Sequence, residues 1–224
     1  MGIQFTSTST RRFAVRAAGL GAAVLCALLI ATGARANEDP ADFVRHLGDR
    51  ATAIFGDGDL SADMQRQAFR GVLRTHFDLD RISRAVLGRH WRRASDQERA
   101  AYRRVFEDYL VATNTRRLKG YAGERFRVGD ARDTGAKGTF VASEFVRPKQ
   151  PPVRLVWRLM PAEGSWRVVD ILIEGVSMVV THRAEFQAAI RQSGGRIEGL
   201  LDRLRTVIAR LAAAPQQHAH ATVQ

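Results

Sequence analysis

Residues 153–173 read VRLVWRLMPAEGSWRVVDILI, which is two strand-like runs joined by a turn that contains Pro161 and Gly164. An alternation of apolar and polar side chains is typical of a strand that buries one face. In the first run, the apolar positions that share a face are Val153, Leu155, Trp157 and Leu159. In the second run they are Val169, Ile171 and Ile173, and Asp170 falls on the opposite face. Both strands therefore have one apolar face, as in an antiparallel sheet with one buried side.

Two further strand-like stretches precede this pair, at residues 126–128 and 139–146. The intervals between the stretches are rich in glycine, aspartate and proline, which favour turns. Connections this short indicate strands that follow one another in an antiparallel meander. The sequence therefore predicts a four-stranded sheet.

Helical patterns flank the predicted sheet on both sides. Before it, apolar spacing predicts helices at residues 40–55, 61–76 and 79–87, and a longer helix that begins with the capping box Ser95-Asp96-Gln97-Glu98. That longer helix has one apolar, aromatic-rich face made of Tyr102, Val105, Phe106, Tyr109, Leu110 and Thr113. After the sheet, two more helices are expected, ending near residues 192 and 211. Helices, then strands, then helices again indicate the α+β class.

The first 36 residues have the three parts of a secretory signal peptide. Arg11, Arg12 and Arg16 precede an apolar run over residues 17–31, and Ala34-Arg35-Ala36 offers a cleavage site. The apolar run is shorter than the ~20 residues that cross a bilayer. We therefore expect export to the periplasm with cleavage after Ala36, by either the Sec or the twin-arginine route.

Cleavage would leave residues 37–212 as one domain and 213–224 as a short tail. The tail consists of small and polar residues, so we expect it to be disordered. The single cysteine of the chain, Cys26, lies in the predicted signal peptide, so the domain has neither a disulfide nor a thiol nucleophile.

The chain is basic, with a net charge of +12. Residues 1–36 contain four arginines and no acidic residue, so +8 remains after cleavage. The cluster Arg89-His90-Trp91-Arg92-Arg93 places an aromatic ring among arginines. An exported protein meets anionic membrane surfaces and acidic partner patches rather than DNA, so we expect no nucleic-acid binding.

Catalytic and metal-binding patterns are incomplete in this sequence. Gly175-Val176-Ser177-Met178 resembles a nucleophile elbow, but Val179 stands where that elbow requires glycine. His182 with Glu185, or His218 with His220, supplies too few ligands for a zinc site. We therefore expect a protein that is not an enzyme and that has no metal and no catalytic residue. The apolar sheet face and helix stripe fit either a solid core or a sheet that curls away from its helices around a cavity.

Two signatures resemble those of the MlaC (toluene-tolerance) family. The first is Gly88-Arg89-His90-Trp91 with the helix from Ser95 to Leu110. The second is Pro151-Pro152-Val153-Arg154-Leu155, then Gly164-Ser165-Trp166-Arg167-Val168-Val169-Asp170, followed by Glu174-Gly175-Val176-Ser177-Met178. The resemblance is collinear from about Pro40 to Leu211. His90-Trp91 departs from the family, in which two tyrosines are common at these positions.

The resemblance implies an NTF2-like fold, in which a curved antiparallel sheet and N- and C-terminal helices surround an apolar lipid cavity. It also implies a monomeric periplasmic carrier of phospholipid, which is cargo rather than a cofactor. The implied partners are an outer-membrane lipoprotein complex and an inner-membrane ABC transporter with a lipid-handling ring. Such a system maintains outer-membrane lipid asymmetry.

A cavity of this kind would be lined by apolar residues of the capped helix and of the sheet. We predict a wall made of Phe106, Tyr109, Leu110, Leu155, Trp157, Ile171, Ile173, Val176 and Met178. Three alternatives remain open: a hopanoid or sterol-like cargo, an envelope adaptor with a filled core that binds no lipid, and, last, a hydrolase.

Overall fold

The computed structural model describes residues 38–56, 60–118, 125–146 and 150–213. The predicted signal peptide and all of the predicted tail except Ala213 lie outside the described residues. Within the described ranges, no helix is both long enough and apolar enough to cross a membrane.

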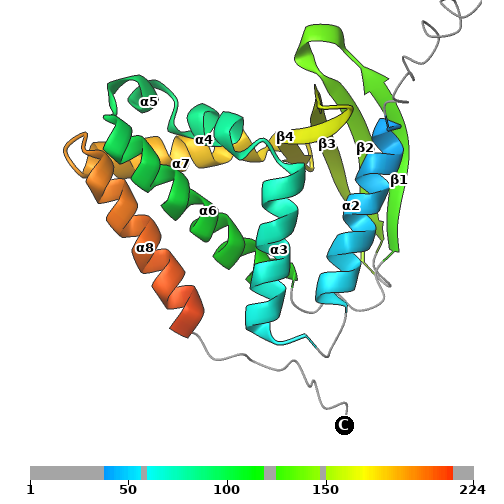
Figure 1. Cartoon of the computed structure of the whole chain (residues 1–224), viewed down its shortest axis with the longest axis horizontal. Helices are drawn as coiled ribbons and strands as arrows, with labels where there is room; N and C mark the ends of the chain where they lie inside the picture. Colours follow the sequence, from blue (N-terminus) through cyan, green and yellow to red (C-terminus); the bar gives the residue numbers. More distant parts are fainter. Residues whose placement is uncertain (1–37, 57–59, 119–124, 147–149, 214–224) are drawn as a thin grey trace, which may run out of the picture. The chain divides into compact units, whose positions relative to one another are not determined.

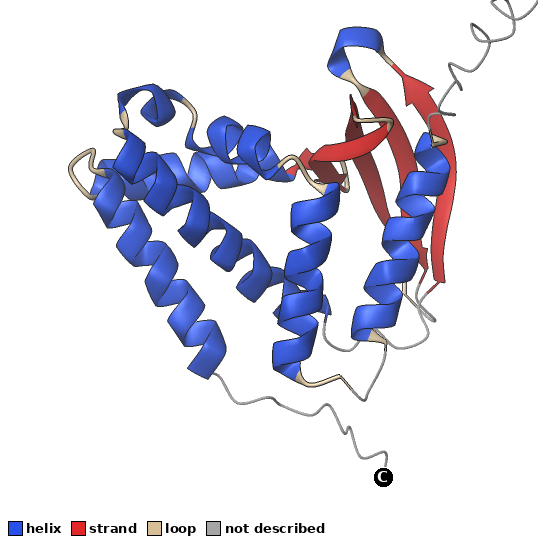
Figure 2. Cartoon of the chain, viewed as in Figure 1, coloured by secondary structure: helices blue, strands red, loops and turns tan. Residues whose placement is uncertain are grey.

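Helices precede and follow one sheet, as Figures 1 and 2 show. The elements before the sheet are α2 (Pro40–Phe55), α3 (Ala62–His76), α4 (Leu79–Leu87), α5 (Arg89–Arg93) and α6 (Asp96–Leu118). The sheet contains β1 (Arg125–Asp133), β2 (Thr139–Val146), β3 (Val153–Ala162), β4 (Ser165–Ile173) and β5 (Val176–Ser177), with a short 3-10 turn, η1 (Gly135–Lys137), between β1 and β2. The chain then forms α7 (Met178–Gln192) and α8 (Ile197–Ala213). The predicted α+β class is confirmed.

The strands form a curved antiparallel meander in the order β1-β2-β3-β4-β5. The four predicted strands are present, but β1 is longer than the predicted residues 126–128. A register shift between Val128 and Ala131 lets the strand continue through Gly129 and Asp130, which the sequence indicated as a turn. The fifth strand is the two-residue edge Val176–Ser177, which local pattern alone did not predict.

The register brings the apolar positions of β2, β3 and β4 onto one face. Val141 pairs with Trp157, which pairs with Ile171, and Leu155 pairs with Ile173. A second shift, between Arg158 and Leu159, places Val168 opposite Leu159 and leaves Val169 as the extra residue of β4. The alternation predicted for β4 therefore holds at Ile171 and Ile173 and breaks at Val169.

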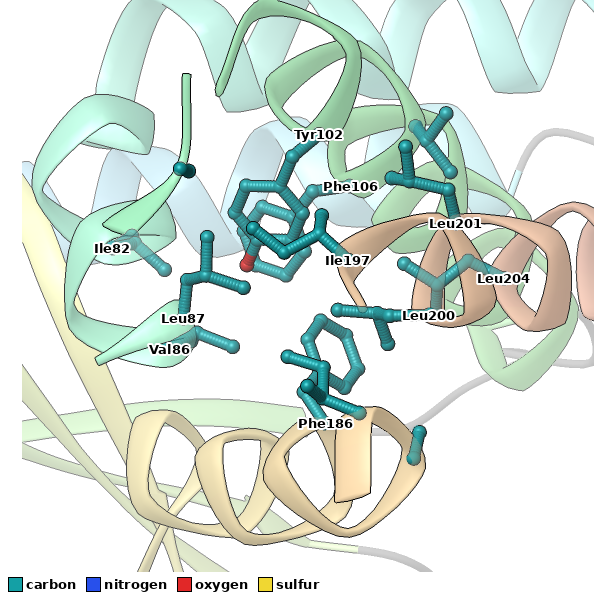
Figure 3. Close-up of a cluster of buried hydrophobic side chains, with 14 residues drawn as sticks. Ile82, Val86, Leu87, Tyr102, Phe106, Phe186, Ile197, Leu200, Leu201 and Leu204 are labelled. Atoms are coloured by element: carbon teal, nitrogen blue, oxygen red, sulfur yellow. The ribbon is translucent and has the colours of Figure 1, made fainter. Parts of the chain in front are cut away.

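The buried apolar side chains form two clusters. The helical cluster joins α4, α6, α7 and α8, and Figure 3 shows Tyr102, Phe106 and Phe186 near its centre. The sheet cluster joins Phe43, Val44 and Leu47 of α2 to Val141, Leu159 and Val168 of the sheet. Phe77, which follows α3, packs against both clusters and forms an isolated bridge with Val168.

The helices begin where the sequence provides caps. The side chain of Asp39 accepts hydrogen bonds from the first turn of α2, and Pro40 is its first residue. At α6, Glu98 accepts from the Ser95 amide at 2.6 Å, and the Ser95 hydroxyl accepts from the Glu98 amide at 3.2 Å. The predicted capping box is therefore confirmed. The hydrogen bond from the Ser95 backbone holds the pKa of Glu98 below its usual value.

Asp170 of β4 attaches α7 to the sheet. Its carboxylate accepts from the Ser177 hydroxyl at 2.5 Å and from the Val179 amide at 3.1 Å. The Ser177 hydroxyl in turn accepts from the Val180 amide at 3.1 Å. Two of the free N–H groups at the start of α7 are therefore satisfied from the strand–helix junction.

We predict that Asp170→Ala lowers the free energy of unfolding by roughly 1–3 kcal/mol, because the partly buried Val179 amide and Ser177 hydroxyl lose their partner. Urea unfolding followed by circular dichroism measures the change. Asp202→Ala is the matched control, since the Asp202 carboxylate is exposed and its ion pair is with Arg205 on the same helix. Equal stabilities of the two variants would show that the junction is not anchored by Asp170.

Candidate functional site

The sheet face that points toward α2, here called the inner face, is the largest continuous apolar feature of the sheet. The positions that the strand pairing places on it include Phe126, Val128, Thr139, Val141, Ser143, Phe145, Val153, Leu155, Trp157, Leu159, Val168, Ile171 and Ile173. Most of these side chains are apolar or aromatic, and the polar Thr139 and Ser143 are both buried.

The inner face is covered unevenly. Val141, Leu159 and Val168 have no exposed surface, because the N-terminal half of α2 packs on them. Toward the other end of the strands, Phe145, Val153 and Ile173 are only partly buried. Val176, which pairs with Ile173 at the sheet edge, is 55% exposed. One end of the face is therefore part of the core, and the other end, here called the open end, leaves apolar surface accessible.

Trp157 lies between the covered and the open ends in a fixed orientation. Its indole N–H donates to the hydroxyl of the buried Ser143 at 2.8 Å, so the polar atoms of both side chains are satisfied. The ring meets Phe126 edge-on with centroids 6.3 Å apart, and Phe126 contacts Phe145 at 4.8 Å. Ser143 was not among the predicted wall residues, because a hydroxyl on an apolar face gives no signal in the sequence.

The structure brings together the sheet residues of the predicted wall. Leu155, Trp157, Ile171 and Ile173 are cross-strand neighbours on the inner face, and Val176 continues that face onto β5. Met178, the first residue of α7, is partly buried just beyond β5.

The three helical residues of the predicted wall belong to the helical cluster instead. Phe106 is 1% exposed, stacks on Tyr102 and meets Phe186 edge-on, at centroid distances of 5.5 and 5.9 Å. Tyr109 and Leu110 are partly buried at the edge of this cluster, with Tyr109 against His182 and Phe186. The predicted wall is therefore divided between two packing units.

Two pockets occur outside the inner face. One, of about 380 Å³, lies among α6, α7 and α8 and includes Tyr109, Phe186 and Leu204 in its lining. The other, of about 630 Å³, lies beside α2 and mixes apolar with charged residues, among them Glu38, His46, Arg50 and His76. Neither was predicted from the sequence, because the lining residues belong to separate elements and form no motif.

The residues considered for chemistry have structural contacts. The Ser177 hydroxyl caps α7 and donates to Asp170, while the His182 imidazole lies 3.2 Å from Glu185 on its own helix. Asp170, which falls on the strand face opposite the apolar positions, is partly buried by this arrangement. Among the described residues, no three His, Cys, Asp or Glu side chains are grouped so that they could hold a metal ion.

His76 lies at the pocket beside α2. Its ring meets Phe43 edge-on at 5.8 Å. Burial, together with the positive charges of Arg50 and Arg167, lowers the pKa of His76 below its usual value. The neutral imidazole is therefore the form that the folded protein favours.

The fold and this site define a class: an α+β domain whose curved antiparallel sheet has an apolar inner face that its helices cover only in part. The model of the MlaC protein family matches residues 46–206, which is 161 of the 224 residues. The chain belongs to the MlaC family, and the predicted family is confirmed.

A solved structure from Ralstonia solanacearum has a similar fold. It is described as a phospholipid-binding protein in complex with a phospholipid. The two chains are 24% identical with a TM-score of 0.66, and the match covers 78% of this chain and 99% of that one. At this identity, the likeness shows that the two proteins share a fold.

We predict that, because of His76, the free energy of unfolding decreases as the pH falls. Its folded-state pKa is lower than its unfolded-state value of about 6.5, so the unfolded chain binds more protons as the pH drops through that value. The stabilisation is fully present well above pH ~6.5 and is lost as the pH falls toward the folded-state pKa. His76→Gln is expected to reduce the loss in unfolding free energy between about pH 7.5 and about pH 5.

The exposed His46 provides the control, because His46→Gln removes an imidazole from the same pocket without opening the contact with Phe43. The prediction fails if the His76 and His46 variants show the same dependence on pH as the unaltered protein.

Proposed function

We propose that this protein is a periplasmic phospholipid carrier that holds acyl chains against the inner face of its sheet. The observation that carries the proposal is the uneven cover of that face. The partly exposed Phe145, Val153 and Ile173 lie at the open end of the same face whose covered end holds the buried Val141, Leu159 and Val168, with Trp157 between the two ends. Accessible apolar surface joined to a rigid core is the usual form of a site for an apolar ligand.

The physical task explains why such a surface would be needed. A diacyl phospholipid has roughly 30 methylenes, and each costs ~0.8 kcal/mol to move into water. Unaided escape from a bilayer therefore costs on the order of 20 kcal/mol. A carrier lowers this cost by offering apolar side chains in place of water, and it needs no nucleophile, acid or base.

The uneven packing also suits release of the cargo. The two apolar clusters are distinct, Phe77 packs against both, and we propose that side chains between them rearrange when lipid enters or leaves. A site that can change its volume lets a partner shift the balance between bound and free lipid. On this proposal, Trp157, Ile171 and Ile173 face the lipid from the sheet, and Leu110 at the edge of the helical cluster bounds the site.

The proposed setting follows from membership of the MlaC family and from the signal-peptide pattern of residues 1–36. As the soluble component of an Mla-type ABC transport system, the protein would exchange lipid with an outer-membrane lipoprotein complex and with an inner-membrane transporter that has a lipid-handling ring. It would act as a monomer and contribute to outer-membrane lipid asymmetry.

We predict that protein recovered from the periplasm begins at Asn37 and carries a single phospholipid. Native mass spectrometry measures the mass of the chain and of the complex, and lipid extraction identifies the cargo. A hopanoid or sterol-like molecule in place of phospholipid would change the cargo class. Protein that consistently lacks any lipid would favour an adaptor role and would contradict the proposal.

We predict that Trp157→Asp lowers phospholipid occupancy, because a carboxylate on the inner face would have to be desolvated against acyl chains. Val156→Asp is the matched control. Val156 is the preceding residue of the same strand, is also partly buried, and points to the opposite face, where it pairs with Ala142 and Leu172. Occupancy is measured as phosphorus per protein after gel filtration.

Circular dichroism first establishes that each variant is folded. If Trp157→Asp does not fold, Ile173→Asp at the open end makes the same test with less damage to the core, and Leu110→Asp tests the helical side. Equal occupancy in folded inner-face and opposite-face variants would remove the inner face from the binding site.

A further inference from the structure

Positive charge is concentrated on one short part of the chain. Residues 79–104, which cover α4, α5 and the start of α6, contain eight arginines and three acidic residues, a net charge of +5. The chain after residue 36 has a net charge of +8. Most of the net charge therefore belongs to these 26 residues. Six of their arginines, Arg84, Arg89, Arg92, Arg93, Arg99 and Arg103, are here called the arginine surface.

Trp91 organises the centre of the arginine surface. The guanidinium carbons of Arg84, Arg99 and Arg103 lie 5.4, 5.6 and 5.0 Å from the centroid of its ring. Such contacts are cation–π interactions, which restrict the arginine side chains. Because Trp91 itself packs against the helical cluster, three guanidinium groups from two helices have positions fixed by the core.

Three further arginines extend the surface outward. Arg89, Arg92 and Arg93 are exposed on α5, while His90 between them is 7% exposed and anchors this short helix. Burial, followed by the positive charges of Arg89, Arg93 and Arg191, lowers the pKa of His90. Nearby acidic groups neutralise the surface only in part: Asp96 pairs with Arg99 and Asp80 with Arg103, each at 3.0 Å.

Membrane insertion does not fit this surface. The large hydrophobic side chains that are strongly exposed in the described residues are Met64, Val176 and Val180, all outside residues 79–104. Trp91 is surrounded by guanidinium groups and packed on its other side, so it is not available to enter the lipid interface. Segments that lie in a membrane interface combine basic residues with exposed apolar ones. Residues 79–104 have the basic residues but no strongly exposed large apolar side chain.

We propose that the arginine surface is the docking site for an acidic patch on a partner protein. Guanidinium groups held at fixed positions suit discrete carboxylates, to which arginine can donate two parallel hydrogen bonds. Electrostatic docking of this kind accelerates encounter and still allows rapid dissociation, as a carrier requires. Figure 1 shows α5 at the end of the helical cluster remote from the sheet, so docking leaves the inner face free.

The test compares the exported protein with Arg89→Gln/Arg92→Gln/Arg93→Gln, using immobilised poly-L-glutamate as the acidic probe. The control triple variant, Arg125→Gln/Arg132→Gln/Arg154→Gln, removes the same charge from exposed positions on β1 and β3. We expect the first variant to bind roughly tenfold more weakly and the control to bind nearly as well as the unaltered protein. Raising the salt from about 0.1 M to about 1 M, which shortens the Debye length from ~10 to ~3 Å, should abolish binding.

Equal losses in the two triple variants would overturn the proposal, because net charge rather than the arginine surface would then determine binding. A second arm measures sedimentation with vesicles that contain phosphatidylglycerol and phosphatidylethanolamine. Vesicle binding that is lost in the first triple variant, without comparable binding of polyglutamate, would assign the surface to membranes and contradict a protein partner. Phospholipid occupancy is expected to be unchanged in both variants, so failure here is distinguishable from failure of the proposed carrier function.

Discussion

The pairing of β3 with β4 is the constraint on which the other features depend. With Trp157 opposite Ile171 and Leu155 opposite Ile173, large apolar side chains lie side by side on one face. A slip of one residue would move all of them to the other face and would expose arginines to α2. The register shift at Val169 completes the arrangement, because it places Val168 beneath the first turns of α2 while Asp170 remains available to cap α7. The same strand therefore fixes the core, the candidate site and the direction of a helix.

Much of this architecture follows from patterns that are local in the sequence. The capping box at Ser95, the Asp39-Pro40 helix start and the alternation in residues 153–159 predicted elements that the structure contains. Local pattern does not report irregular pairing, so the extension of β1 through Gly129 and the extra residue Val169 were not predicted. Both depend on the neighbouring strand.

The candidate site shows a similar limit. Periodicity identified the buried faces, and four predicted sheet residues indeed lie together on the inner face. Periodicity does not say which partner each face meets. Phe106 points into the helical cluster, where it stacks with Tyr102, and the hydrogen bond from Trp157 to Ser143 joins residues of different strands. Family resemblance supplied what local pattern lacked, since it predicted the fold as a whole.

The fold separates the two regions that the proposed carrier function and the proposed docking would use. Apolar side chains that helices leave partly exposed lie on the sheet, whereas the concentrated positive charge lies on α4, α5 and α6. Each region is fixed by a different part of the core, the sheet cluster for the first and the helical cluster for the second. Such separation would allow cargo and partner to be bound at the same time.

The central claim, that acyl chains lie against the inner face, is tested most directly through Trp157 itself. The chain contains three tryptophans, so Trp91→Phe/Trp166→Phe leaves Trp157 as the single indole. Loading this variant with phospholipid whose acyl chains are brominated places a contact quencher in the bound lipid. We predict that Trp157 emission is markedly lower than with the same lipid unbrominated. Equal emission from the two loaded samples, with lipid shown to be bound by phosphorus analysis, would contradict the account.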